Sequence, residues 1–286
     1  MTMLARRPMM MRAALGGAGV PVGQYDAVAN VVHHYEIARC GYTAYDGNPL
    51  VRLRRASDDA EANFTNVSTR NQNLNLAAIA AWAGGASYIV TAFDQVGNDD
   101  VTQATAANQP LFTASMQNGH AGAFYDGTND YLQGAYTNGG ALSQPFSVYV
   151  LAQLDATVVN DGSLHTVVDG DDATNRMRLF QRNVGPPTNW SLYAGAALGG
   201  GASDANWNIW AILLNGASSQ FWANAASEAS GNAGAHNADG LVVGARNDGG
   251  ESWKGYIGPI IVADPAHSDA QRVVMQNAIN AYWAAY

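Results

Sequence analysis

Two carboxylates near the end of the chain are the best candidates for catalysis. Asp248 and Glu251 stand three residues apart in a glycine-containing stretch, and the chain has only three other glutamates, at positions 36, 61 and 228. Hydrolysis of a glycosidic bond needs two carboxyl groups that flank the bond, roughly 5–9 Å apart. Because Asp248 and Glu251 both fall in a turn, we expect them to be solvated, and we expect no catalytic residues.

Three aspartates in one short loop are candidates for binding a cation. Asp169, Asp171 and Asp172 offer carboxylate oxygens, which hard cations such as calcium prefer. They lack the twelve-residue EF-hand spacing, so a hairpin turn is the favoured interpretation and a calcium site the weaker alternative. His33 and His34 lie in a stretch with helical periodicity, where adjacent side chains point to different faces, and no second cluster completes a zinc site. They are interpreted as surface or interface residues, and no cofactor is expected.

Aromatic residues beside loops are candidates for binding carbohydrate. Sugar sites combine flat aromatic faces with Asn, Asp and Gln side chains that hydrogen-bond to hydroxyl groups. Two such combinations are present: Trp190 with Tyr193, and Trp253 with Asn247 and Asp248. The competing interpretation, which remains favoured, is that the tryptophans fill the core of a β-sandwich, where aromatic rings bury large areas. The core interpretation is strongest for three further tryptophans: Trp207, Trp210 and Trp222.

Charge is unevenly distributed along the 286 residues, which carry a net charge of −9. Residues 71–175 contain ten aspartates and neither lysine nor arginine. Because nucleic-acid binding depends on cationic side chains that displace counterions from phosphates, this acidic middle argues against a nucleic-acid partner. No apolar run approaches the roughly 18 residues of a membrane span. Cys40 is the only cysteine, so we expect a buried apolar residue rather than half of an intrachain disulfide.

Turn signals dominate the chain after residue 117. Eight Asn-Gly or Asp-Gly pairs lie there, and these dipeptides tolerate the positive φ angles of tight hairpins. Many short strands with regular turns are typical of a β-sandwich or jelly roll. The run 207–214 is apolar on both faces, which predicts a central strand. Ser268 and Gln271 have capping-box spacing, which predicts a C-terminal helix. Eight β-prone runs lie between the turns: 146–154, 164–168, 176–181, 190–193, 207–214, 220–223, 241–243 and 256–262.

Residues 25–115 show a mixed pattern. Apolar residues have helical spacing over 26–40, with Asp26 as the N-cap, and a second, short helix is expected from Asn73 to Gly84. A half-buried strand is expected over 50–56, where apolar and polar residues alternate, and 87–93 is a further strand-like stretch. The sequence therefore predicts a short α/β lead-in over 25–115, ahead of a β-sandwich core.

The predicted division of the chain is an arm followed by one large unit. Residues 1–24 are rich in Met, Gly and Ala and have no period of their own, so we expect an extended N-terminal arm that becomes ordered on a neighbouring subunit. Residues 25–286 would form the folded unit, with its β-sandwich core at 116–286.

One loop carries the strongest family signal. Residues 93–110 read FDQVGNDDVTQATAANQP. This run resembles the segment YDQSGNG-(N/H)-x-TQ-x-x-x-x-NQP of proteins related to the catalytic domain of α-L-arabinofuranosidase B, which also recurs in phage virion proteins. Residues 42–61 agree with the same proteins upstream, and 124–132 (FYDGTNDYL) resemble the entry into a concanavalin-A-like (laminin-G-like) jelly roll. The resemblance covers roughly 35–286 and implies a mainly β, concanavalin-A-like fold that ends in a helix.

The resemblance also shows where the chemistry of the family is missing. Its nucleophilic glutamate lies in a strand that ends L-E-N-G, and the matching run here is 211–216, AILLNG. Leu214 takes the place of the glutamate, and a leucine side chain cannot attack an anomeric carbon. The acid/base aspartate of the family falls near Asp248. We therefore expect the scaffold of the glycosidase without its activity.

These observations favour a non-enzymatic structural protein of a bacteriophage virion. It would be exposed at the virion surface in many copies, as a head decoration, fibre or spike protein or associated with the tail, and residues 1–40 would contact other virion proteins. Multicopy display suits weak attachment to host-surface glycans, because avidity raises the effective affinity. Two alternatives remain open: an arabinofuranosidase-like glycoside hydrolase, and a free carbohydrate-binding module.

Overall fold

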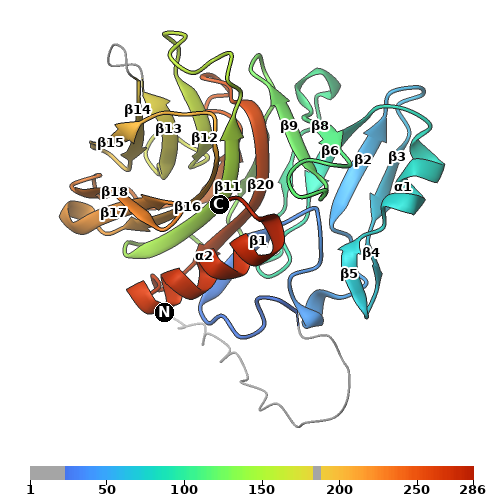
Figure 1. The fold of residues 1–286 in the computed structure, drawn as a ribbon, viewed down its shortest axis with the longest axis horizontal. Coiled ribbons are helices and arrows are strands. Elements are labelled where there is room, and N and C mark those ends of the chain that lie inside the picture. Colours follow the sequence, from blue (N-terminus) through green and yellow to red (C-terminus); the bar gives the residue numbers. More distant parts are fainter. Residues whose placement is uncertain (1–22, 183–187) are drawn as a thin grey trace, which may run out of the picture.

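The computed structural model describes residues 23–182 and 188–286. Within them, eighteen strands join one hydrogen-bonded sheet that folds over itself into two layers, and two more strands form a separate hairpin (Figure 1). The result is the mainly β, jelly-roll-like sandwich that the sequence predicts. The N-terminal arm expected over residues 1–24 lies outside the described residues except for its last two positions. No helix in the described part of the chain is long and apolar enough to cross a membrane.

The first layer is called the helix-side sheet, because helix α2 (Asp269–Trp283) packs on it. Its neighbouring strands are antiparallel, and β1 (Val31–Tyr35) lies beside one half of its longest strand, β20. The remaining strands follow in this order across the layer: β18 (Ala226–Gly231), β17 (Ser219–Ala223), β16 (Trp207–Leu214), β11 (Phe146–Leu154), β20 (Lys254–Ala263), β9 (Gly122–Asp126), β8 (Leu111–Thr113), β6 (Ser87–Ala92), β2 (Val51–Arg55) and β3 (Glu61–Phe64).

The second layer is called the opposite sheet. Its last strand pairs with β6 and so joins the two layers at one end of the molecule. The strands of this layer are β15 (Ala197–Ala202), β14 (Asn189–Tyr193), β13 (Arg178–Arg182), β12 (His165–Asp169), β19 (Gly240–Val243), β10 (Leu132–Ala135) and β7 (Val101–Thr102). The smaller elements are the hairpin β4 (Asn66–Ser68) and β5 (Asn71–Leu74), helix α1 (Leu76–Ala83) and the 3₁₀ turns η1 (Thr43–Tyr45), η2 (Ala106–Asn108) and η3 (Gly216–Ser218).

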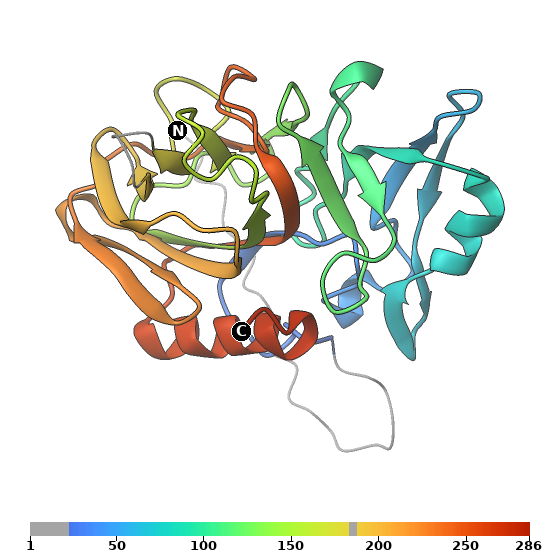
Figure 2. The same cartoon turned by 45° about the horizontal axis from the view of Figure 1, so that its top comes forward.

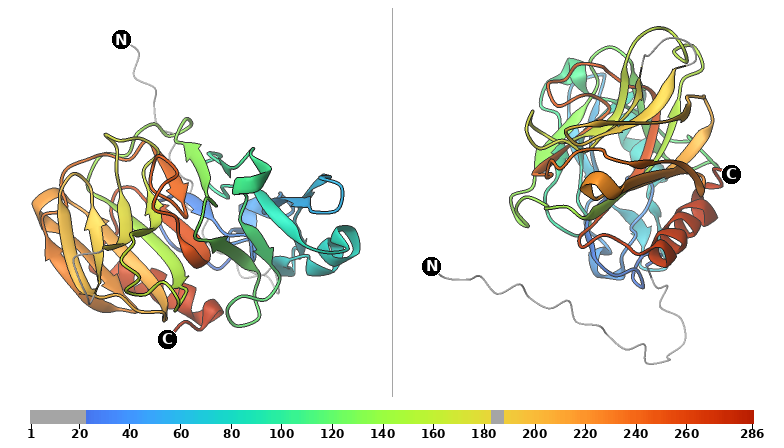
Figure 3. Two further views of the ribbon diagram at one scale, coloured as in Figure 1. Left: turned by 90° about the horizontal axis from the view of Figure 1, so that it is seen from above. Right: turned by 90° about the vertical axis from the view of Figure 1, so that its left-hand side faces the viewer.

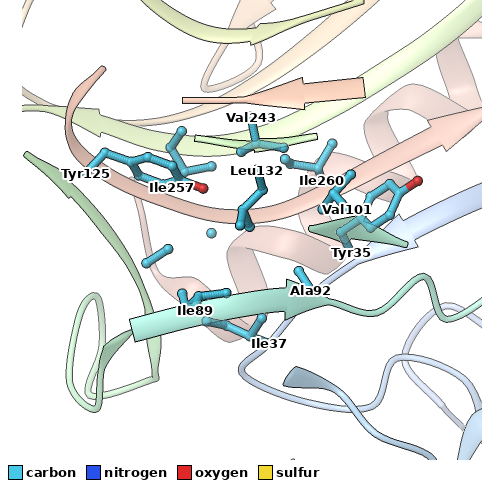
Figure 4. Close-up of a pocket in the computed structure, with 12 residues that line it drawn as sticks. Tyr35, Ile37, Ile89, Ala92, Val101, Tyr125, Leu132, Val243, Ile257 and Ile260 are labelled. Atoms are coloured by element: carbon cyan, nitrogen blue, oxygen red, sulfur yellow. The ribbon is translucent and has the colours of Figure 1, made fainter. Parts of the chain in front are cut away.

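The interior between the two layers is apolar and closely packed. Three tryptophans meet there, with ring centroids 4.8 Å apart for Trp190 and Trp210 and 6.2 Å apart for Trp190 and Trp253. A residual cavity of about 30 Å³ is lined by aliphatic and tyrosine side chains from both layers, among them Ile89 and Val243 (Figure 4). Because its lining is almost entirely apolar, the cavity is a packing defect of the core rather than a ligand site.

Helix α2 covers part of the outer face of the helix-side sheet (Figures 2 and 3). It begins at the predicted capping box. The Ser268 side chain accepts a hydrogen bond from the Gln271 backbone N–H, and the Gln271 side chain accepts one from the Ser268 backbone N–H. Met275, Ile279 and Trp283 are buried against outward-facing side chains of the central strands. The prediction of a C-terminal helix is confirmed, and the helix gives this sheet a second, smaller core on its outer side.

The central strands agree with the sequence, whereas the expected first helix is wrong. β11 and β16 have the predicted bounds, and β16 lies between β11 and β17 as a central strand should. Residues 26–40, however, contain strand β1 instead of a helix. Its sequence VVHHY is rich in β-branched and aromatic residues, and pairing with β20 satisfies its backbone. The apolar residues of this stretch have spacings that fit a helix or a strand, so pairing with a distant strand decides which of the two forms.

The short helix begins two residues later than predicted. Asn75, not Asn73, is the N-cap of α1, because the chain up to Leu74 is held in the hairpin β4–β5. Gly84 ends the helix in the left-handed conformation, as its position predicts. Of the strands in the predicted lead-in, β4 and β5 form the separate hairpin. The others up to β8 belong to the same continuous sheet as the strands of the rest of the chain.

Candidate functional site

Leu214, which the sequence resemblance aligns with the nucleophile of arabinofuranosidases, lies inside the core. Leu214 is the last residue of β16, is 0% exposed and pairs with Phe146 of β11. Its side chain faces the interior, like those of Trp210 and Ile212 on the same strand. An apolar side chain enclosed by other apolar side chains supplies neither a nucleophile nor space for a sugar.

The two candidate catalytic carboxylates are held by arginines. The Arg246 guanidinium bonds to Asp248 and, at 2.7 Å, to Glu251, while Arg178 forms a second ion pair with Glu251. Hydrogen bonding from Arg246 lowers the pKa of Asp248 to about 2. A carboxyl group that is ionised at neutral pH cannot act as a general acid there. The expectation of a solvated turn is right for the exposed Asp248, whereas Glu251 is partly buried.

Asp169 is separated from the other two aspartates of its loop. It is buried at the end of β12, where it accepts two hydrogen bonds from Arg176, at 2.8 and 2.5 Å, and one from the Asn247 backbone N–H. Burial raises the pKa of Asp169, and the Arg176 guanidinium opposes this rise. Because both carboxylate oxygens are engaged, Asp169 is part of a structural ion pair and drops out of the candidate cation ligands.

The remaining two aspartates meet a third that the sequence analysis did not include. Carboxylate oxygens of Asp171, Asp172 and Asp239 lie within 4.8 Å of one another, and among the described residues this is the acidic group that could hold a cation. The Asn175 amide donates to Asp172 at 3.0 Å and to Asp239 at 2.7 Å. Partial burial and the neighbouring Asp239 raise the pKa of Asp171 to about 7. No local signal links Asp239 to this loop, because it lies far along the chain, just before β19.

The two candidate sugar platforms have no exposed tryptophan. Trp190 and Trp253 are 2% and 0% exposed, so neither ring offers a face to a ligand, and the core interpretation is correct for both. Tyr193 is half-buried, with the Arg176 guanidinium 5.5 Å from its ring centroid. Asn247 and Asp248 remain partly accessible in their turn. Because both tryptophan rings are buried, Tyr193, Asn247 and Asp248 lack the exposed tryptophan faces on which their candidate role in sugar binding was based.

The histidine pair is buried rather than exposed. His33 bonds to Asp94 at 2.7 Å and His34 to Glu36 at 3.1 Å, and both residues are buried. The prediction of surface residues on a helix is therefore wrong: the strand β1 turns both side chains into packed surroundings. Cys40 is fully buried, as predicted.

A row of half-exposed side chains crosses the outer face of the helix-side sheet. Residues directly opposite each other in antiparallel strands point to the same face, so the pairing register of the strands defines the row. The row starts with Trp207. For Trp207, and likewise for Trp222 on β17, the core interpretation holds only in part, because both side chains pack against the smaller core but are only partly buried. From β16 to β2 the paired residues are Trp207, Gln153, Tyr256, Phe124, Leu111, Tyr88 and Arg54.

One half of this row forms the floor of a groove of about 630 Å³, called the outer groove. Gln109 stands at its wall and fixes the end of the row, since its amide oxygen accepts from Arg54 Nε at 2.6 Å. The Arg54 guanidinium also lies 4.9 Å from the Tyr88 ring centroid and pairs with Asp59. The groove is lined by Arg54, Ala56, Tyr88, Ala106, Ala107, Gln109, Leu111, Phe124, Asp126 and Asp130.

The sequence analysis missed the outer groove. Local alternation is present, since Phe124 lies between the buried Ala123 and Tyr125, and this signals one outward-facing aromatic ring. Tyr88 and Tyr256 lie in the same row as Phe124 only because of the register of strands that are more than 160 residues apart in sequence. No local pattern encodes this register. Burial raises the pKa of Asp130 in this groove to about 6.

Comparisons with known proteins support the architecture. No family model matches the sequence, and no curated protein matches it. Among solved structures, a GH54 α-L-arabinofuranosidase soaked with a cyclic sulfate inhibitor is 15% identical with a TM-score of 0.69, over 93% of this chain and 66% of that chain. An arabinofuranosidase complexed with arabinofuranosyl-α-1,2-xylobiose is 17% identical, also with a TM-score of 0.69, over 93% and 65%.

The chain thus spans slightly less than two thirds of the length of those enzymes. At such low identity the likeness establishes the fold alone. The protein has a β-sandwich of the kind found in arabinofuranosidases.

Proposed function

We propose that the protein is a non-enzymatic structural protein of a bacteriophage virion, which displays a glycosidase-like β-sandwich at the particle surface and uses it to bind host glycans. The observation that carries the non-enzymatic part is the buried Leu214 at the nucleophile position. The two candidate carboxylates, Asp248 and Glu251, do not replace it, because both are engaged by arginines. A retaining glycosidase without a nucleophilic carboxylate cannot form its covalent intermediate.

The structural part of the proposal is supported by the loop 93–110, which resembles a segment found in phage virion proteins. Its polar side chains are committed to the fold. Asp94 accepts from the backbone of His34, and Gln95 bonds to the backbone of Gly41 and Glu36. A loop whose polar groups hold neighbouring backbone in place belongs to a scaffold rather than to a reaction site.

The absence of activity is tested with 4-nitrophenyl α-L-arabinofuranoside. We expect no release of nitrophenol above the rate in buffer. Turnover that is lost in Asp248→Ala or Glu251→Ala, but kept in the exposed control Asp58→Ala, would support the hydrolase alternative instead.

The virion role is tested on purified particles. We expect the protein to be present in many copies per particle and accessible to antibody on intact particles. Removal of residues 1–24 should abolish incorporation while the isolated protein keeps its thermal transition. A protein that is absent from particles and is recovered as a secreted monomer would support the free carbohydrate-binding module.

A further inference from the structure

We propose that the outer groove, together with the aromatic row that continues from it, binds an uncharged, linear glycan chain that lies across the strands. The inference rests on the proposed glycan-binding role and names the surface and the class of ligand. It moves the binding site from the Trp190 and Trp253 region, where the rings are buried, to the outer face of the helix-side sheet.

The aromatic rings of the row are suited to stacking on sugar rings. The ring centroids of Phe124 and Tyr256 are 5.0 Å apart, and those of Tyr256 and Trp207 are 5.8 Å apart. All three side chains are partly exposed on strands whose opposite faces are buried in the core. A flat ring held by packing on one side loses little conformational entropy when a ligand stacks on it. The row therefore offers a rigid, amphipathic surface.

The length of the row indicates a chain rather than a single sugar. It crosses seven strands, from β16 to β2, which gives six interstrand steps. At about 4.8 Å per step the row extends over roughly 29 Å. A monosaccharide covers only a fraction of this distance, so stacking at several rings needs a linear oligosaccharide or polysaccharide.

The charges around the outer groove indicate an uncharged ligand. Asp126 is exposed, Asp130 is buried, and no cation pairs with either carboxylate in the described residues. The one cation of the lining, Arg54, is already neutralised by Asp59 at 2.7 Å. The Lys254 ammonium, on the neighbouring strand, donates to Thr157 instead. An anionic chain would be repelled by the two carboxylates, whereas sugar hydroxyl groups can donate hydrogen bonds to them.

The test measures binding of the full chain to xylohexaose and cellohexaose, two neutral hexasaccharides, and to hexagalacturonate, an anionic one, by isothermal titration calorimetry. We expect binding of at least one neutral chain and none of hexagalacturonate. Phe124→Leu and Tyr88→Leu keep an apolar side chain but remove the flat ring, and each should weaken binding about tenfold. Tyr193→Leu, which alters a half-buried tyrosine of the opposite sheet, should leave the affinity unchanged.

A second measurement guards against variants that fold poorly. The neutral chain should raise the Tm of the wild type and of Tyr193→Leu by similar amounts, and that of Phe124→Leu by less at the same ligand concentration. Loss of binding in Tyr193→Leu alone would overturn the inference and leave glycan binding intact at another site. Equal affinity for hexagalacturonate would overturn it as well. Failure of all three chains to bind would remove the groove as a glycan site, while particle incorporation and the nitrophenol assay still decide the structural role separately.

Discussion

Two tryptophans on one strand show how differently the two faces of the helix-side sheet are used. Trp210 and Trp207 are three residues apart on β16. Trp210 points inward, is fully buried and packs against Trp190. Trp207 points outward, remains partly exposed and lies beside Tyr256. Successive side chains of a strand point to opposite faces, so two residues an odd number of positions apart lie on different faces. One tryptophan therefore lies in the core and the other on the outer face.

This contrast explains why aromatic composition misleads as a guide to function. The tryptophans that stood beside turn residues and resembled a sugar platform are core residues, whereas two that were interpreted as core, Trp207 and Trp222, are partly exposed on the outer face. The outer face is not uniformly open, since α2 covers the part near Tyr149 and Ile261. What remains uncovered is the row that leads into the outer groove.

The largest expected effect separates the two tryptophans directly. Trp210→Ala should lower the free energy of unfolding by about 3–5 kcal/mol, because it leaves a cavity in a closely packed interior. Trp207→Ala should cost less than about half as much, since its ring is partly solvated already. Urea denaturation of both variants measures the difference. Equal losses would contradict the assignment of the two faces.

A glycine beneath the row gives the next largest effect. Gly255 has a φ of +135°, and an added Cβ would lie 2.1 Å from the Gln153 carbonyl oxygen. We expect Gly255→Ala to destabilise the protein by about 2 kcal/mol or more and to displace the adjacent Tyr256 from the row. Gly85→Ala is the matched control, because no heavy atom lies within 4 Å of its added Cβ. Similar stabilities of the two variants, measured by thermal unfolding, would show that the row does not depend on this close approach.

A smaller effect concerns the helix that covers the rest of the outer face. Ser268→Ala removes the capping bond to the Gln271 backbone N–H and should cost about 1 kcal/mol. The control is Ser230→Ala, on the exposed strand β18. If α2 frays, its contacts with the smaller core should weaken while the interior between the sheets stays intact. Hydrogen exchange should then increase in residues 269–283 and not in β11; a uniform increase would contradict two separable cores.

The smallest effect is a dependence of stability on pH, which again differs between the two sides. The pKa values of Asp130 and Asp171 are raised in the native state. Between about pH 4 and pH 7 the native state therefore keeps protons on these carboxyl groups that the unfolded chain has released. As a result, the free energy of unfolding should fall as pH rises through this range. Asp130→Asn, in the outer groove, should flatten this decline up to about pH 6. Asp171→Asn, at the end of the opposite sheet, should flatten it up to about pH 7.

Each of these changes should stay below about 1 kcal/mol, because water screens Asp171, which is partly exposed, and Asp130, which is buried but lines the open outer groove. Thermal melts at several pH values measure the slope. A slope that survives both substitutions would show that other groups titrate.

The fold was largely predictable from particular local signals. The bounds of β11 and β16, the Ser268 capping box and the glycine end of α1 all depend on neighbours in sequence. The helix expected over 26–40 failed because its apolar spacing fits two periods and the choice depends on pairing with β20. Local signals therefore predict elements well where one period dominates, and poorly where a distant strand decides.

The candidate sites were less predictable than the fold. Asp171 and Asp172 were identified, but Asp239 joins them only through the packing of β12 against β19. Likewise, Glu251 resembled a free carboxylate until the tertiary structure placed Arg178 and Arg246 beside it. A site is defined by side chains that meet in space, and their meeting requires the register of strands far apart in sequence.

The sequence by itself determined the class of fold, the many hairpin turns, the closing helix and the leucine at the position of the family nucleophile. Each of these follows from residue identity or from a period within one segment. Only the tertiary structure decided which aromatic rings are accessible. Every strand has two faces, and the elements that cover each face come from other parts of the chain. The interior face is closed by the opposite sheet and part of the outer face by α2. The remaining part is the outer groove.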